Sequence, residues 1–123
     1  MKKKLLTAVI LAILPLGAAQ AMDVATFLAK ADALQKKGML ALMSSDYKLL
    51  KAEIETNALA LRAERLAAER ARRRAAYCPP AKQSLNSNEI LASFRTIPAA
   101  QRPRTPVKDA LRALLVRKYP CRG

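Results

Sequence analysis

Two cysteines and a cluster of arginines are the side chains whose types and spacing could do chemistry. Cys78 and Cys121 are the only cysteines among the 123 residues. An isolated pair at the two ends of a segment predicts a disulfide in an exported protein. The bond would close a loop of about forty residues, worth about 4 kcal/mol in the chain-entropy model. We therefore expect a structural disulfide, which leaves neither sulfur free to act as a nucleophile or a metal ligand.

The arginines lie between positions 62 and 74, where Glu64 and Glu69 are the only carboxylates. The forked donors of arginine suit phosphate and carboxylate groups, so this segment could be an anion-binding arm. The alternative is a solvated helix end, supported by a Glu69–Arg73 pair and by cations near the negative end of the helix dipole. No aromatic residue is interleaved, which argues against single-stranded nucleic acid as the ligand. The candidate anion-binding residues are Arg62, Arg65, Arg70, Arg72, Arg73 and Arg74.

Other catalytic chemistry has little support in this sequence. The chain contains no histidine, which removes the usual general base and the commonest transition-metal ligand. After Ala21 the only glycines are Gly38 and Gly123, so there is no glycine-rich phosphate cradle. The nine carboxylates show no acid/base or cation-loop spacing. We expect a non-enzymatic protein with no cofactor and no metal.

The first 21 residues have the three parts of a secretory signal peptide. Three lysines, Lys2 to Lys4, precede an apolar run from Leu5 to Leu16 and a small-residue end at Ala19-Gln20-Ala21. The apolar run is shorter than the roughly 20 residues that span a bilayer. Cleavage after Ala21 would place the mature protein in the periplasm or outside the cell, where the cysteine pair could oxidise.

Cleavage would leave 102 residues, enough for one domain with a modest core. The net charge would fall only from +14 to +11, because three lysines and no acid are removed. Such a charge favours anionic partners, such as nucleic acid, anionic lipid, lipopolysaccharide or an acidic protein surface, without conferring specificity. General solubility is the alternative explanation of the same charge.

The first predicted helix covers residues 23–37. Asp23 suits its N-cap, and Gly38 suits a left-handed stop after its last turn. Residues 39–43 then form a short apolar turn or helix, which we expect to fill the core because methionine adapts to gaps between helices. The apolar face of the first helix consists of Val24, Phe27, Leu28, Ala31 and Leu34.

A second, long helix is predicted over residues 46–76, with Ser44 or Ser45 as its N-cap. Its second half, residues 62–76, has Leu66 as the only large apolar side chain and should project into solvent. Its first half carries a buried-looking stripe at spacings of three and four residues, namely Tyr47, Leu50, Ile54, Ala58 and Leu61.

Two shorter helices follow the proline pair Pro79-Pro80. Asn86 is the expected N-cap of the third helix, with Glu89 as its capping-box partner. The fourth helix is expected to begin with Thr105 as N-cap and Pro106 at the first helical position. Its apolar face contains Val107, Ala110, Leu111, Leu114 and Leu115.

The predicted fold class is all-α, because no alternating strand pattern competes with these helices. We expect a single domain over residues 22–123, a small bundle of about four helices closed by the disulfide. Within it, residues 62–76 form the exposed arginine-rich end of one long projecting basic helix, and residues 78–121 form a disulfide-closed subregion.

The C-terminal half resembles the Rap/Tai immunity family. These are small exported helical proteins of the type VI secretion system that protect a cell from a periplasmic peptidoglycan amidase toxin. The resemblance covers roughly residues 77–121, and it implies a helical fold, a disulfide and a protein partner. It is carried by Tyr77-Cys78-Pro79-Pro80, by the capped helix with Glu89, Ile90 and Leu91, by the segment from Pro106 to Leu115, and by Tyr119-Pro120-Cys121.

The N-terminal half departs from that family, because it lacks the family's further cysteine pair and glycine-rich turn. Over its full length the chain looks more like a group of exported bacterial proteins of unassigned function. The shared segments are Thr26-Phe27-Leu28, Leu49-Leu50-Lys51-Ala52-Glu53 and Ile97-Pro98-Ala99-Ala100-Gln101-Arg102.

Three functional hypotheses follow from these observations. The first is a non-enzymatic periplasmic protein that binds another protein, a toxin or an envelope protein, as an immunity-like inhibitor of a cell-wall amidase toxin. The second is a cationic envelope module that binds an anionic polymer or lipid through the arginines of residues 62–74. Further cations could aid this binding, namely Arg102, Arg104, Arg112, Arg117 and Lys118. The third makes the long helix a dimer stem, with the oligomeric state left open.

Overall fold

The structure is a computed structural model that describes residues 21–122. The predicted signal peptide, apart from Ala21, lies outside these residues. The described part is all-α, as predicted, and contains no strand. Its elements in chain order are α1 (Val24–Lys36), the short 3-10 helix η1 (Gly38–Met43), α2 (Ser45–Arg70), α3 (Ser87–Arg95), the 3-10 helix η2 (Arg102–Arg104) and α4 (Val107–Lys118).

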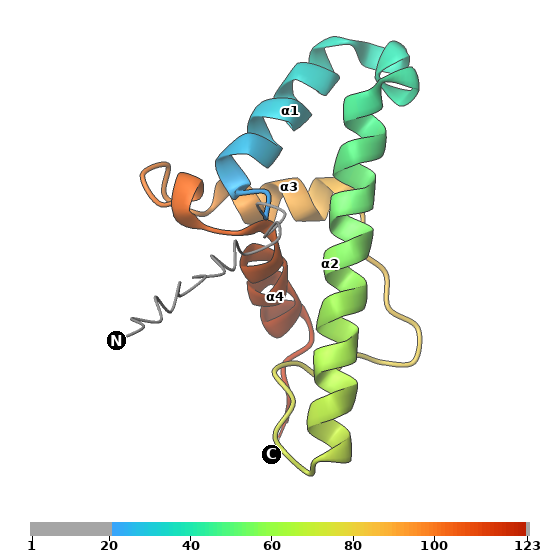
Figure 1. The fold of residues 1–123 in the computed structure, drawn as a ribbon, viewed down its shortest axis with the longest axis vertical. Helices are drawn as coiled ribbons and strands as arrows, with labels where there is room; N and C mark the ends of the chain where they lie inside the picture. Colours follow the sequence, from blue (N-terminus) through green and yellow to red (C-terminus); the bar gives the residue numbers. More distant parts are fainter. Residues whose placement is uncertain (1–20, 123) are drawn as a thin grey trace, which may run out of the picture.

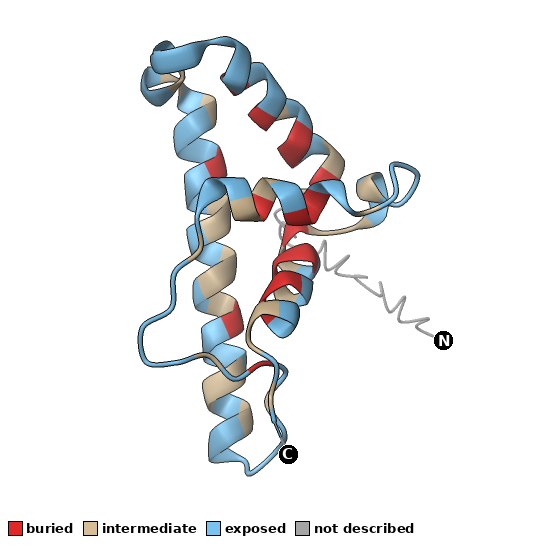
Figure 2. Ribbon diagram, turned by 180° about the vertical axis from the view of Figure 1, so that it is seen from behind, coloured by how far each residue is buried: buried red, intermediate tan, exposed pale blue. Residues whose placement is uncertain are grey.

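The long helix α2 forms one side of the molecule, and α1 and α4 pack on it (Figure 1). Helices α1 and α2 form a hairpin joined by η1 at one end of the molecule, while α4 lies beside the opposite half of α2. Helix α3 crosses the molecule between α1 and α4 and contacts both. Buried residues therefore gather on the inner faces of α1, α3 and α4, whereas α2 is mostly exposed (Figure 2).

The core forms where α1, α3 and α4 meet. Phe94 of α3 is fully buried, and its ring meets Phe27 of α1 edge to face with the centroids 5.2 Å apart. Such an edge-to-face contact stabilises the core beyond the contribution from burying the two rings. All five apolar residues predicted for α1 and all five predicted for α4 are buried.

Helix α1 confirms both of its predicted ends. The Asp23 carboxylate caps its N-terminus by accepting hydrogen bonds from the Thr26 backbone N–H (2.8 Å) and hydroxyl (2.9 Å). Gly38 follows the helix at φ +58, the left-handed conformation expected of a helix stop. Helix α3 likewise shows the predicted capping box between Asn86 and Glu89.

Helix α4 begins one residue later than predicted. Pro106, not Thr105, is its N-cap, and the proline has an extended backbone with ψ 143. A single antiparallel bridge to Asp23 holds it there, because the Val24 N–H donates to Thr105 O and the Val107 N–H donates to Met22 O, each at 2.9 Å. This tertiary pairing overrides the local preference of proline for the first helical position.

The apolar segment 39–43 was wrongly predicted to be core. Met39 is 84% exposed and Met43 is 83% exposed. The segment lies at the end of the α1–α2 hairpin, beyond the reach of α3 and α4 (Figure 1). Of the predicted α2 stripe, Leu50 and Leu61 are buried, Ile54 and Ala58 are partly buried, and Tyr47 is exposed.

Candidate functional site

The C-terminal end of α2 carries most of the arginine cluster, and the helix ends earlier there than the sequence predicts. Helix α2 stops at Arg70 instead of Ala76. Its end is a Schellman motif, in which the Arg73 N–H donates to Ala68 O (2.8 Å) and the Arg72 N–H donates to Glu69 O (3.1 Å). Arg72 takes the left-handed position, at φ 54, that glycine usually fills.

The chain reverses at this point because two later residues are fixed elsewhere. Tyr77 is 2% exposed, packed into the core, and Cys78 is bonded to Cys121 with an S–S distance of 1.99 Å. The Cys78 N–H also donates to Tyr119 O at 2.8 Å. A helix continuing to Ala76 would carry Tyr77 away from the core, so the tertiary contacts outweigh the helical pattern of the sequence. The disulfide prediction is confirmed.

Arg65 differs from the other arginines of the cluster because it is largely buried. Its side chain is 14% exposed, donates to the Glu69 carboxylate at 3.0 Å, and lies 5.7 Å from the centre of the Tyr77 ring. Glu69 therefore pairs with Arg65, and the predicted Glu69–Arg73 pair does not form. Arg65 Nε is the one buried side-chain nitrogen or oxygen without a hydrogen-bond partner in residues 21–122.

The remaining arginines at the end of α2 are exposed. We call Arg70, Arg72, Arg73 and Arg74 the arginine cap. Within residues 21–122, none of these four side chains takes part in an ion pair or a side-chain hydrogen bond. The disulfide brings the exposed Arg122, which follows Cys121, to the same end of the molecule (Figure 1). The four guanidinium groups of the cap thus face solvent without a carboxylate partner in residues 21–122, and Arg122 adds a fifth cation at this end. Arg62 lies two turns earlier on α2.

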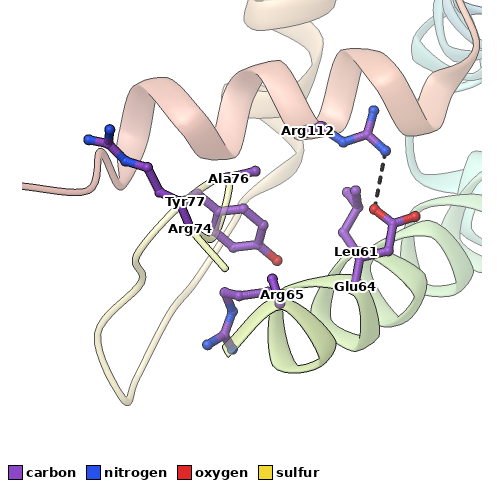
Figure 3. A pocket seen from close by; sticks show the side chains of 8 residues that line it. Leu61, Glu64, Arg65, Arg74, Ala76, Tyr77 and Arg112 are labelled. Carbon is purple, nitrogen blue, oxygen red and sulfur yellow. Dashed lines mark hydrogen bonds and ion pairs between the residues drawn. The ribbon is translucent and has the colours of Figure 1, made fainter. Parts of the chain in front are cut away.

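A small cavity of about 170 Å³ lies beside the arginine cap, between α2 and α4. Figure 3 shows the Tyr77 ring between these helices, with Leu61 and Arg65 on α2 and with Arg112 reaching from α4 toward Glu64. The floor is largely apolar and the rim carries guanidinium groups. The lining residues are Leu61, Glu64, Arg65, Ala68, Arg74, Ala76, Tyr77 and Arg112.

Glu64 is the acidic residue of this cavity, and its charge is already neutralised by α4. It accepts hydrogen bonds from Lys108 and from Arg112, the latter at 3.2 Å. The hydrogen bond from Lys108, followed by that from Arg112, holds the pKa of Glu64 below its usual value of 4.5. The carboxylate is thus ionised at neutral pH. The cavity lining stays cationic because its three arginines outnumber this one acid.

A second, more open groove of about 650 Å³ continues from the far side of Arg65. Arg62 and Lys82 add two more cations to its lining, together with the loop from Pro79 to Gln83. The predicted anion-binding residues therefore divide into three places. The arginine cap gathers four of them, Arg62 lines the groove, and Arg65 lies buried between the cavity and the groove.

Sequence reasoning did not bring Tyr77 and Arg112 together in this region. Tyr77 was noted only as the neighbour of Cys78, and Arg112 only as one of the C-terminal cations that could aid the arginine-rich segment. Their closeness to α2 depends on the packing of α4 and on the disulfide, which no local spacing encodes. A tyrosine directly before a disulfide cysteine was the one available signal, because such a residue is held near the crosslink.

Neither a metal site nor a membrane span is found in the described chain. No group of three or more cysteine, aspartate or glutamate side chains in residues 21–122 is close enough together to hold a metal ion. No described helix combines the length and the apolar content needed to cross a membrane.

Comparisons of this chain with protein-family models, with curated proteins and with solved structures gave no match. The resemblance of residues 77–121 to the Rap/Tai immunity proteins therefore stays a prediction.

Proposed function

We propose that this protein is a non-enzymatic periplasmic binding protein, and that its arginine cap receives an acidic surface of another protein. The observation that carries the proposal is the set of four exposed arginines, Arg70 and Arg72 to Arg74, that have no acidic partner in residues 21–122. Arginine forms paired hydrogen bonds with carboxylates, so such a surface favours an acidic partner.

The neighbouring cavity favours a protein over a featureless polymer as the partner. Its apolar floor, with Leu61 and Tyr77, can receive a small apolar side chain of the partner. The buried Nε of Arg65 lacks an acceptor, and a buried donor without one costs about 1–3 kcal/mol. Arg65 also lines the cavity, so a carboxylate that reaches this nitrogen on binding would supply that acceptor.

The resemblance to Rap/Tai proteins supplies the proposed class of partner. That family protects cells from a periplasmic cell-wall amidase toxin, so we propose immunity-like inhibition of a co-encoded effector as the specific role. The predicted signal peptide and the disulfide support the periplasm as the compartment, because disulfides form and persist there.

The proposal is tested with oxidised protein recovered from the periplasm and an effector encoded beside its gene. The cap variant replaces Arg70, Arg72, Arg73 and Arg74 with Gln. A matched control removes four charges elsewhere, through Lys36→Gln, Lys37→Gln, Lys48→Gln and Arg104→Gln. We expect titration calorimetry to show effector binding that is at least tenfold weaker for the cap variant and within about threefold of wild type for the control, since buried charge pairs cost about 2 kcal/mol or more to remove. Equal affinities for all three proteins would remove the cap from the interface.

A second candidate is a cationic envelope module that binds an anionic polymer or lipid. The open groove with Arg62 and Lys82 favours it, because the groove extends the positive surface along the loop 79–83. Polymer binding through these cations would weaken steeply with salt, with a log–log slope set by the number of neutralised anionic groups. A protein interface in which the partner also fills the cavity would, by contrast, keep most of its affinity at a salt concentration on the order of 0.5 M NaCl.

A further inference from the structure

The turn between α1 and α2 presents an apolar surface at the opposite end of α2 from the arginine cap. We call Met39, Leu40, Leu42 and Met43 of η1 the apolar tip. Each of these side chains is at least half exposed, and Met39 and Met43 are almost fully exposed. Large apolar side chains gathered in this way usually mark an interaction site.

The tip has a defined shape, because its backbone is fixed at both ends. Gly38 turns the chain at φ +58, and the Ser44 N–H donates to Ala41 O at 2.9 Å. Ala41 packs inward against the core, so the other four apolar side chains remain outside. The tip closes the α1–α2 hairpin at one end of the molecule (Figure 1) and is coloured mostly as exposed in Figure 2.

Positive charge surrounds the tip. Lys36 and Lys37 precede it and Lys48 follows it, and all three are exposed without an ion pair among the described residues. Asp46, the acid nearest to the tip in the sequence, is already paired with Lys30 at 3.2 Å. The tip is therefore an apolar projection with a collar of lysines.

We propose that the apolar tip inserts into the surface of an anionic lipid bilayer. Apolar side chains flanked by lysines are the composition of segments that lie in the membrane interface, where apolar burial and attraction to anionic headgroups act together. The shape agrees, because a convex projection enters a deformable lipid surface without needing a matching pocket. A second copy of the chain is a poorer occupant, since the two lysine collars would repel each other. This inference goes beyond the proposed function and uses a different surface.

The first experiment measures binding to vesicles by flotation. Oxidised protein recovered from the periplasm is mixed with vesicles of phosphatidylcholine containing 30% phosphatidylglycerol, on the order of an anionic bacterial leaflet, or with phosphatidylcholine alone. The tip variant carries Met39→Ser, Leu40→Ser and Met43→Ser. Its matched control is Leu59→Ser, at a residue of α2 that is 66% exposed and remote from the tip. Circular dichroism confirms that each variant folds.

We expect anionic vesicles to bind the wild type and the Leu59→Ser control equally, and the tip variant about tenfold or more weakly. Replacing Lys36, Lys37 and Lys48 with Gln should weaken binding by about fivefold per lysine, because each cation near an anionic surface contributes about 1 kcal/mol. Vesicles of phosphatidylcholine alone should bind the wild type more weakly than anionic vesicles do, because they offer no anionic headgroups to its cations.

A second experiment reports insertion directly, because the chain contains no tryptophan. Leu40→Trp places a single fluorescent probe in the tip, and Leu59→Trp places the same probe on α2. Anionic vesicles should shift the Leu40→Trp emission to shorter wavelength, and brominated lipid chains should quench it. The Leu59→Trp emission should not change.

Three results would overturn the proposal. One is a tip variant that floats with anionic vesicles as the wild type does. Another is an emission wavelength of Leu40→Trp that does not change although the protein is bound to anionic vesicles. The third is a wild-type dimer in sedimentation that the tip variant abolishes, with no vesicle binding by either protein, since a second copy would then be the occupant.

Discussion

Arg72 has a backbone conformation that its side chain disfavours. Its φ of 54 lies in the left-handed region, where a Cβ atom costs about 1–2 kcal/mol. We expect Arg72→Gly to raise the free energy of unfolding by about 0.5–1 kcal/mol, because glycine relieves this cost but has more freedom to lose on folding. Urea denaturation measures the change. Arg72→Ala is the control, since it removes the same charge and keeps the Cβ atom, and an equal gain for both variants would trace the effect to charge.

At the scale of single residues, helix caps could be predicted from the sequence and the stop at Arg72 could not. Asp23, Asn86 and Glu89 bond to backbone groups within three residues, so their roles depend on local spacing alone. Arg72 lacks the signal that Gly38 provides. Its conformation follows from the positions of Tyr77 and Cys78, which only the packed structure fixes.

Helices α2 and α4 are linked by one carboxylate that two cations share. Glu64 accepts hydrogen bonds from Lys108 and Arg112, and the first of these is the main reason that its pKa lies below 4.5. A lowered folded pKa adds stability that is present above the unfolded value and is lost as the pH falls through the folded value. We therefore expect the free energy of unfolding to decrease below about pH 4.5, in urea titrations at pH 7, 5, 4 and 3.

Two other carboxylates also contribute to this loss of stability at low pH, so the effect of Glu64 must be separated from theirs. The backbone N–H of Thr26 lowers the pKa of Asp23, and the hydrogen bond from Lys118 lowers the pKa of Glu89. Glu64→Gln should therefore flatten the acid limb only in part, and Lys108→Gln should flatten it less, because Arg112 remains. An acid limb that is unchanged in Glu64→Gln would show that this link is not formed in solution.

The disulfide joins the chain after α2 to the chain after α4. It spans 43 residues, and a loop of that length should contribute about 4 kcal/mol by restricting the unfolded chain. We expect the double variant Cys78→Ser/Cys121→Ser to lose stability of that order in urea denaturation. The wild type kept in reductant is the control and should match it. A loss below about 1 kcal/mol would show that packing around Tyr77 already holds the two segments together.

At the scale of elements, the sequence identified four helices and the disulfide, with errors where packing decided. The predictions for α1 and α3 were accurate, because each has a cap at its start and a clear apolar face. Segment 39–43 was predicted to lie in the core because methionine side chains adapt to gaps between helices. Its exposure follows from the hairpin geometry that Gly38 imposes, and from the absence of any described element packed over that end of the molecule.

The molecule as a whole carries an excess of positive charge that should destabilise its compact state. The net charge is +14 for the full chain, or +11 without the predicted signal peptide. Repulsion is screened by salt, whereas exposed ion pairs such as Lys51–Glu55 are worth at most about 1 kcal/mol each. We expect the thermal midpoint to rise between about 20 and 300 mM NaCl, and to rise less in the fourfold arginine-cap Gln variant. A midpoint that falls with salt would mean that the ion pairs outweigh the repulsion.

Only part of the candidate site could be predicted from the sequence. Composition and spacing indicated six arginines, and four of them do gather in one cap. The separation of Arg65 from that cap could not be predicted. It depends on the packing of Tyr77 in the core and on the ion pair between Glu69 and Arg65. The cavity between α2 and α4 required the packed structure for the same reason.

The length of α2 has a consequence for how its two ends can be used. A helix of 26 residues is about 39 Å long at 1.5 Å per residue, which sets the distance between the apolar tip and the arginine cap. The Debye length in physiological salt is about 8 Å. Lipid headgroups in contact with the tip would therefore exert almost no field at the cap, so α2 acts as an insulating spacer and both ends can be occupied at once.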